Sequence, residues 1–168
     1  MRYSQIIPFD VCNGKGIGLS LFVQGCKFHC KGCFNSETWN FDGGKEWNEE
    51  IKNKFFELIN RPYIKRVSIL GGEPLADENI SEIYNLISEI KERFPDKDIW
   101  LYTGYEWDEM IMESNKRHYI ISECDIVVDG RYIEEQRDIT LPFRGSKNQR
   151  VIDVKKSLEK NEIVLYEE

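Results

Sequence analysis

Four short apolar runs are spaced along the chain, at residues 19–23, 67–70, 99–102 and 126–128. They are rich in Val, Ile, Leu and aromatic residues, and they lack the clean polar alternation of a strand with one face in solvent. Strands with this composition are usually covered on both faces, as in a parallel sheet with helices packed against it. The pattern therefore predicts four buried strands.

Between these runs, apolar residues recur at intervals of three and four, which is the period of an amphipathic helix. The two clearest series are Trp47, Ile51, Phe55, Leu58 and Ile59, and then Ile80, Ile83, Tyr84, Ile87, Ile90 and Phe94. We expect Asp77 or Asn79 to cap the second helix and Pro95 to close it. A third, less regular helix is expected from residue 106 towards residue 117.

Strands that alternate with helices at this spacing predict parallel βα units. A complete barrel of eight units takes about 250 residues, so the 168 residues of this chain leave room for about five or six. We therefore expect an α/β fold, an incomplete parallel barrel, in a single domain over residues 1–168, since no repeat or linker divides the chain. Residues 150–154 and 163–166 are expected to add edge strands, either parallel or as a hairpin.

The chain is acidic, with 23 Lys and Arg against 30 Asp and Glu and a net charge of −7. Nucleic acids bind to basic surfaces, so a DNA or RNA partner is disfavoured. The apolar runs are far shorter than a membrane span, which disfavours a membrane partner. Four lysines nevertheless lie around the cysteine motif described below: Lys15, Lys27, Lys31 and Lys45. They either make a locally positive mouth for an acidic electron donor or are incidental charges of a solvated loop.

Cysteine usage indicates a reducing compartment. The chain has five cysteines, which is an odd number, and no apolar signal region precedes it. We therefore expect a cytoplasmic protein without a disulfide framework. Two of the cysteines, Cys12 and Cys124, stand apart from the others, and we interpret both as small buried apolar residues.

The other three cysteines form the most informative motif in the chain. Cys26, Cys30 and Cys33 make a C-x3-C-x2-C run within eight residues. Three thiolates can hold a four-iron cluster and leave its fourth iron open for a substrate, whereas electron-carrier clusters take four cysteines. A zinc site that also uses His29 is the main alternative, although it would need two adjacent residues to bind one ion.

Unusual residues follow each of the four predicted strands. The cysteine motif follows the first strand, Gly-Gly-Glu-Pro at 71–74 the second, Thr-Gly-Tyr at 103–105 the third and Asp-Gly at 129–130 the fourth. In parallel α/β folds the carboxyl ends of the strands share one rim, where ligands bind. Each motif alone is also typical of a plain turn. At 71–74, the two glycines would let the backbone approach a ligand closely, and the following carboxylate can accept hydrogen bonds from an amine.

The cysteine spacing with an aromatic residue at Phe34, and Gly-Gly-Glu-Pro after the next strand, resembles the radical S-adenosylmethionine superfamily. Within it, residues 23–39, 125–131 and 143–150 are similar to the anaerobic ribonucleoside-triphosphate reductase-activating proteins. The resemblance implies an oxidoreductase that cleaves S-adenosylmethionine reductively at one 4Fe-4S cluster. The deoxyadenosyl radical formed would take a hydrogen atom from a glycine of the partner reductase and so install a glycyl radical.

The resemblance also implies roles for individual residues. Cys26, Cys30 and Cys33 would bind the iron of the cluster. Gly32, Cys33, Phe34 and Asn35 lie where the superfamily holds the adenine. The motif of Gly71, Gly72, Glu73 and Pro74 would meet the methionine amine. Thr103, Tyr105 and Asp129 would reach the ribose or the carboxylate.

The implied partners are the anaerobic ribonucleoside-triphosphate reductase and a low-potential electron donor, flavodoxin-like or similar. Two other interpretations stay open: another radical enzyme, such as an activase of a formate lyase or an enzyme acting on a small molecule, and a zinc or iron–sulfur binding module. The basic segment 144–150 either grips the partner or the S-adenosylmethionine carboxylate, or is a solvated loop. If one side of the incomplete barrel stays open, a loop of a large protein can enter it.

Overall fold

The computed structural model describes residues 1–112 and 115–167 and is built around one mixed sheet. Seven strands make up the sheet among these residues, in the spatial order β3-β1-β2-β4-β5-β6-β7. Their bounds are β1 (Arg2–Asp10), β2 (Gly18–Val23), β3 (Lys45–Glu46), β4 (Arg66–Gly71), β5 (Asp98–Tyr102), β6 (Ile126–Asp129) and β7 (Arg150–Asp153). The α/β class expected from the sequence is confirmed.

The four strands predicted from the apolar runs are β2, β4, β5 and β6, and they pair in parallel in that order. The remaining strands are antiparallel, so the sheet holds four parallel strands rather than the expected five or six units. Residues 11–17 connect β1 to β2, a link too short for a parallel crossover. β7 is the expected strand near residue 150 and pairs antiparallel with β6, whereas Leu165 makes only an isolated bridge to Ile152.

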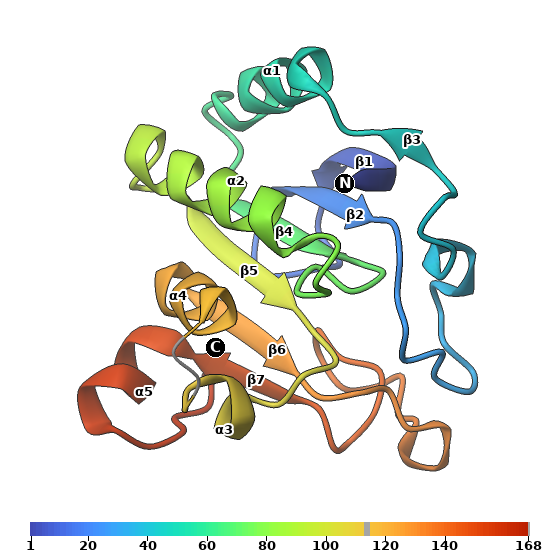
Figure 1. Ribbon diagram of the computed structural model, residues 1–168. Coiled ribbons are helices and arrows are strands. Elements are labelled where there is room, and N and C mark those ends of the chain that lie inside the picture. Colours follow the sequence, from blue (N-terminus) through green and yellow to red (C-terminus); the bar gives the residue numbers. More distant parts are fainter. Residues whose placement is uncertain (113–114, 168) are drawn as a thin grey trace.

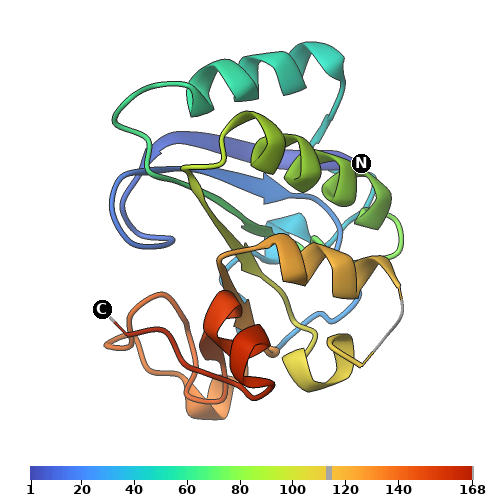
Figure 2. The same ribbon diagram turned by 90° about the vertical axis from the view of Figure 1, so that its left-hand side faces the viewer.

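Helices cover one face of the sheet. The two predicted amphipathic series form α1 (Glu49–Ile59) and α2 (Ile80–Arg93). The expected third helix is divided into α3 (Trp107–Met110) and α4 (Lys116–Glu123), with residues 113–114 outside the described part, and α5 (Val154–Lys160) follows β7. Figure 1 shows α1, α2 and α4 on the same side of the strands, and in Figure 2 these three helices run roughly parallel to one another. No helix described is long and apolar enough to cross a bilayer.

Two short 3-10 helices lie in the connecting segments, η1 (Ser36–Thr38) after the cysteine motif and η2 (Glu134–Gln136) after β6. Of the two expected caps of α2, Asn79 holds the N-cap position, but its side chain does not bond to the helix. The Asn79 amide donates instead to the carbonyl oxygens of Gln24 and Glu73. This residue therefore links the start of α2 to the two loops that follow β2 and β4.

The two faces of the parallel strands differ in what they bury. Side chains on the helix-covered face form a large apolar core, for example Leu21, Ile69 and Leu101. The opposite face, which we call the inner face, carries the alternate residues of the same strands, including the aromatic Trp100 and the polar Ser68. Because successive side chains of a strand point to opposite faces, one strand serves both the core and the inner face.

The loop of residues 11–17 packs against the inner face near the amino-terminal ends of the parallel strands. Ser68 donates to the carbonyl of Asn13 at 2.5 Å, and the buried Arg66 guanidinium donates to the carbonyl of Asp10 at 2.7 Å. Asp10 in turn accepts hydrogen bonds from Ser20 and, at 2.6 Å, from the Asn13 amide. This polar cluster closes the amino-terminal end of the inner face and leaves space towards the carboxyl-terminal end.

Candidate functional site: a cavity at the strand ends

A cavity of about 500 Å³ lies at the carboxyl ends of β2, β4, β5 and β6. Residues from all four predicted motifs reach it, which confirms that the motifs share one rim. Figure 1 shows the arrowheads of these strands pointing the same way, towards the segment that carries the cysteines. The predicted site residues on the cavity wall are Cys26, Cys30, Cys33, Phe34, Asn35, Gly71, Gly72, Glu73 and Thr103.

All three motif cysteines are half-buried on this wall, in residues 24–35, which we call the cysteine loop. Burial raises the pKa of the Cys26 thiol, against hydrogen bonds from the backbone of Phe28 and His29. Burial and the neighbouring Cys33 likewise raise the pKa of Cys30. The backbone N–H of Asn35 lies 3.4 Å from the Cys33 sulfur. Binding of iron therefore has to displace protons from these thiols.

The arrangement fits a cluster better than a single ion. Within the described residues, no three His, Cys, Asp or Glu side chains gather closely enough to hold one metal ion. A zinc ion needs four ligands at about 2.0–2.3 Å, whereas a four-iron cluster carries each thiolate on a different iron and spreads them apart. His29 stacks on the Trp39 ring, with centroids 4.5 Å apart, and is absent from the cavity wall. His29, the fourth ligand of the zinc interpretation, therefore contacts an indole ring rather than the cavity.

Gly-Gly-Glu-Pro is pressed against the start of the cysteine loop. The Glu73 N–H donates to the Gly25 carbonyl at 2.7 Å, and the Gly72 N–H donates to the Val23 carbonyl at 2.9 Å. A Cβ at position 72 would stand 2.5 Å from the Gly25 carbonyl oxygen, so only glycine fits there. These contacts hold the two loops together and place the motif beside Cys26.

The Glu73 side chain is buried and already occupied by the chain's own donors. Its carboxylate accepts hydrogen bonds from the Thr103 hydroxyl at 2.7 Å, from the Gly104 N–H at 2.7 Å and from the Leu75 N–H at 2.9 Å. Burial raises the pKa of Glu73, against these hydrogen bonds and the charge of Arg117. The carboxylate thus braces the loops after β4 and β5, a role that the sequence alone did not indicate.

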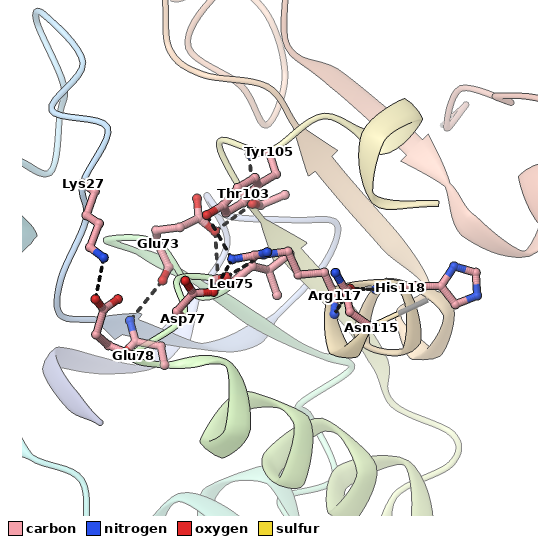
Figure 3. Close-up of polar contacts among 11 residues, drawn as sticks. Lys27, Glu73, Leu75, Asp77, Glu78, Thr103, Tyr105, Asn115, Arg117 and His118 are labelled. Carbon is pink, nitrogen blue, oxygen red and sulfur yellow. Dashed lines mark hydrogen bonds and ion pairs between the residues drawn. The ribbon is translucent and has the colours of Figure 1, made fainter. Parts of the chain in front are cut away.

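Four other predicted residues are not on the cavity wall: Gly32, Pro74, Tyr105 and Asp129. Asp129 is buried and accepts from Arg150 at 2.6 Å and from the Trp107 N–H at 2.8 Å, so it fixes the start of α3. The Tyr105 hydroxyl accepts from Arg117, 3.1 Å away. Figure 3 shows Arg117 extending from α4 towards Tyr105, Leu75 and Asp77, with which it forms a second brace behind Glu73.

Phe28 and Arg131 belong to the site and were not expected from the sequence. The Phe28 ring stands edge-on to Tyr105, with centroids 5.1 Å apart, and the Arg131 guanidinium lies over its face, 4.2 Å from the centroid. A Cβ at Gly104 would lie 2.5 Å from Phe28 ring carbons. Aromatic residues between cysteines carry no sequence signal of their own, because only the folded rim brings 28, 104, 105 and 131 together.

Arg144, Gly145 and Gln149 of segment 144–150 line the cavity, and Gly145 packs against Phe34 of the cysteine loop, since a Cβ there would lie 2.8 Å from the Phe34 ring. Gln149 organises it: its side-chain oxygen accepts from the Gly145 and Ser146 N–H groups, and its amide donates to the Gly130 carbonyl. Arg144 lines the cavity and donates to the Gln149 carbonyl at 2.6 Å. The segment is therefore an ordered wall tied to the end of β6, rather than a free solvated loop.

The interpretation of Cys12 as a buried apolar residue is wrong. Cys12 is exposed and lines the cavity, because the loop of residues 11–17 folds onto the inner face. Cys124 is buried, as expected. Of the four lysines near the cysteines, Lys27 forms an ion pair of 2.6 Å with Glu78, so its charge is partly balanced.

Similarity to known proteins agrees with this geometry. The family described as 4Fe-4S single cluster domain matches residues 12–152. Proteins named anaerobic ribonucleoside-triphosphate reductase-activating protein are similar over nearly the whole chain. The one from Vibrio cholerae is 40% identical over 151 residues, 89% of this chain and 96% of its own length. Those from Escherichia coli K12 and phage T4 are 35% and 38% identical, over 90% of this chain and 97% and 93% of their own lengths.

The chain belongs to the family of anaerobic ribonucleoside-triphosphate reductase-activating proteins. As a member of that family it carries a 4Fe-4S single cluster domain, and the matched residues include the cysteine loop and all four rim motifs. The resemblance noted in the sequence is thereby confirmed at the level of the family.

Proposed function

We propose that this protein is a glycyl-radical activase of anaerobic ribonucleoside-triphosphate reductase. The observation that supports it most directly is the set of three cysteines on the wall of a cavity shared by four strand ends, in a member of the activating-protein family. The 4Fe-4S cluster supplies the electron that cleaves S-adenosylmethionine, whose deoxyadenosyl fragment, released as a radical, takes a hydrogen atom from a glycine of the reductase.

In this proposal, Cys26, Cys30 and Cys33 hold the cluster as thiolates and leave one iron without a protein ligand. Cys12, although it lines the same cavity, comes from the loop before β2, at the opposite end of that strand from the cysteine loop. We therefore do not assign it as a fourth ligand. The residues of this chain bind S-adenosylmethionine, orient it and exclude water around it.

The remaining site residues fall into two groups. Phe34 and Asn35, on the cavity wall, hold the adenine, and Gly32, which lies off that wall with a positive φ of 76°, shapes the turn that leads to them. Gly71, Gly72, Glu73 and Pro74 form the loop that receives the methionine amine. Because the Glu73 carboxylate is engaged with Thr103 and Gly104, the amine is met by backbone carbonyl groups of that loop. Thr103 reaches the cavity, and Tyr105 and Asp129 act through their partners Arg117 and Arg150.

The sheet itself suits a protein substrate. We interpret it as the incomplete barrel of a radical S-adenosylmethionine domain that spans residues 1–168. Its edge strands β3 and β7 do not pair with each other within the described part of the chain. The unclosed side lets a glycine-bearing loop of the reductase reach the cavity. A flavodoxin-like or similar low-potential donor supplies the electron, in the reducing cytoplasm.

The test uses protein reconstituted with iron and sulfide without oxygen, then mixed with reductant, S-adenosylmethionine and the anaerobic reductase. We expect the doublet of a glycyl radical by electron paramagnetic resonance, and methionine and deoxyadenosine as products. Cys30→Ala should give neither. A formate lyase added in place of the reductase tests the related activase interpretation. If loaded protein cleaves S-adenosylmethionine but leaves the reductase without a radical, the proposed substrate is wrong.

A further inference from the structure

Arg131 presents an unpaired positive charge to the cavity that holds the cysteines. It lies two residues after the end of β6 at Asp129, and it lines the cavity together with Cys26 and Cys30. Within the described residues, its guanidinium has no carboxylate within 4.0 Å and donates no hydrogen bond. Arg117 and Arg150, on the same rim, each pair with an aspartate. Arg131 therefore has no direct ion-pair partner in the described part of the chain.

The guanidinium is also held in place. It stacks on Phe28, 4.2 Å from the ring centroid, and Phe28 lies between Cys26 and Cys30 in the chain. The Phe28 ring also makes a T-shaped contact with Tyr105, with centroids 5.1 Å apart, and it packs so closely on Gly104 that a Cβ there would lie 2.5 Å from ring carbons. Cation–π stacking on a ring fixed in this way keeps Arg131 beside the cysteine loop without an acidic partner.

The charge acts on the cysteine loop. Arg131 lines the same cavity as Cys26, Cys30 and Cys33, and its guanidinium lies over the ring of Phe28, a residue of the cysteine loop. A cluster that gains an electron becomes more negative, so the same charge favours the reduced cluster over the oxidised one. Cluster potentials depend on local net charge and on exposure, which gives a single fixed cation a measurable effect.

We propose that Arg131 tunes the reduction potential of the cluster bound by Cys26, Cys30 and Cys33, and raises it through its unpaired charge. This inference rests on the proposed cluster ligation, but not on the identity of the protein substrate. It makes Arg131 a positioning residue for the electron-transfer step. It also gives the Phe28 ring a function, since the ring sets where the charge stands.

The experiment is an anaerobic redox titration of the cluster-loaded protein, without S-adenosylmethionine and without reductase. Arg131→Gln and Arg131→Met remove the charge, and the methionine keeps an apolar stem over Phe28. Arg131→Lys keeps the charge. The control is Arg61→Gln, which removes an exposed arginine that bonds to Tyr63 before the start of β4, at the other end of the strands. Iron content is measured first in every variant.

At a fixed donor potential, we expect the ratio of reduced to oxidised cluster to fall about three- to tenfold in both neutral variants. For a one-electron couple this equals a midpoint about 30 to 60 mV more negative. Arg131→Lys should lie near the wild type, Arg61→Gln should match it, and added salt should shrink the difference because Arg131 is exposed. The readout is the midpoint potential of the cluster. A merely structural change in the loop would not separate the two variants that remove the charge from the lysine variant that keeps it.

Equal midpoints in wild type and both neutral variants overturn this inference, and so does an equal shift in Arg131→Lys. If Arg131→Gln binds too little iron to titrate, Arg131→Met decides alone. Failure here is distinguishable from failure of the proposed function. Wild-type protein that forms a glycyl radical while the midpoints stay equal refutes only the role of Arg131. A shifted midpoint without any glycyl radical refutes only the proposed substrate.

Discussion

The Glu73 carboxylate accepts a 2.7 Å hydrogen bond from the Thr103 hydroxyl, across two neighbouring strand ends. The same carboxylate also accepts a hydrogen bond from the Gly104 N–H, and Thr103 Oγ1 accepts one from the Tyr105 N–H. Through these bonds residues 71–74, which contact the cysteine loop, are fixed to residues 103–105, which support Phe28. One buried side chain thus sets the relative positions of three of the four rim motifs.

Glu73→Gln should therefore destabilise the protein by about 1–3 kcal/mol, because the amide keeps one acceptor oxygen and turns its NH₂ group against a backbone or hydroxyl donor. Urea denaturation of the protein without its cluster measures this. Glu78→Gln is the matched control, since Glu78 pairs with Lys27 on the surface, and it should change stability by less than about 0.5 kcal/mol. Equal effects of the two substitutions would show that the Glu73 network is not a brace.

Gly104→Ala should displace the Phe28 ring and with it the cysteine loop, at a cost of about 1–3 kcal/mol, because its Cβ would stand 2.5 Å from ring carbons. The loss should largely vanish when Phe28 is already alanine. A double-mutant cycle of Gly104→Ala and Phe28→Ala, followed by denaturation, measures this coupling. Additive effects would contradict the packing of residue 104 under the ring.

Iron binding should depend on three cysteines and not on the other two or on His29. Alanine at position 26, 30 or 33 should reduce the iron content from about four per chain to a small fraction of that. Cys12→Ala, Cys124→Ala and His29→Ala should keep the full iron content. Cys12 belongs to the loop before β2, Cys124 is buried away from the cavity, and His29 stacks on Trp39. The measurement is iron and sulfide analysis with the visible absorption spectrum. Zinc in place of iron, lost on His29→Ala, would support the zinc site instead.

Asp10 should contribute a pH-dependent part of stability. Burial raises the pKa of its carboxyl, but hydrogen bonds from Ser20, the Cys12 N–H and Asn13, with the charge of Arg66, outweigh burial and hold the pKa below its ordinary value of 3.8. A carboxyl with a lowered native pKa stabilises the fold above its unfolded pKa and loses that contribution as the pH falls through the native value.

The stability advantage of wild type over Asp10→Asn should accordingly be full above pH 4 and shrink at lower pH. Denaturation of the protein without its cluster, from pH 7 down to pH 3, tests this. Asp42→Asn, an exposed position, serves as a reference whose difference from wild type should stay small throughout. An advantage that grows as the pH falls would contradict the assigned hydrogen bonds.

The central sheet could be predicted because its strands are buried on both faces and read as continuous apolar runs. β1 could not, since its residues alternate irregularly between buried, intermediate and exposed positions and include Pro8. Its place follows from pairing with β2 through a short connection, which is a tertiary outcome. For the same reason the sequence could not set the number of parallel strands.

Within the site, the sequence located the cysteines and the rim, because strand order in a parallel sheet places successive carboxyl ends together. It did not locate the partners of the side chains. Glu73 meets a hydroxyl thirty residues away, and Asp129 meets Arg150, twenty-one residues away. Such pairs depend on three-dimensional proximity, so a carboxylate suited to binding an amine and one that braces a loop look alike in sequence.

The central claim is that three cysteines leave one iron of the cluster open to S-adenosylmethionine. Mössbauer spectroscopy of protein loaded with iron-57 tests it most directly, with and without a saturating amount of S-adenosylmethionine. We predict that one iron in four differs from the rest and that its signal alone changes when S-adenosylmethionine binds. Four irons that stay equivalent and unchanged under saturation would mean that every iron has a protein ligand, and would contradict the account.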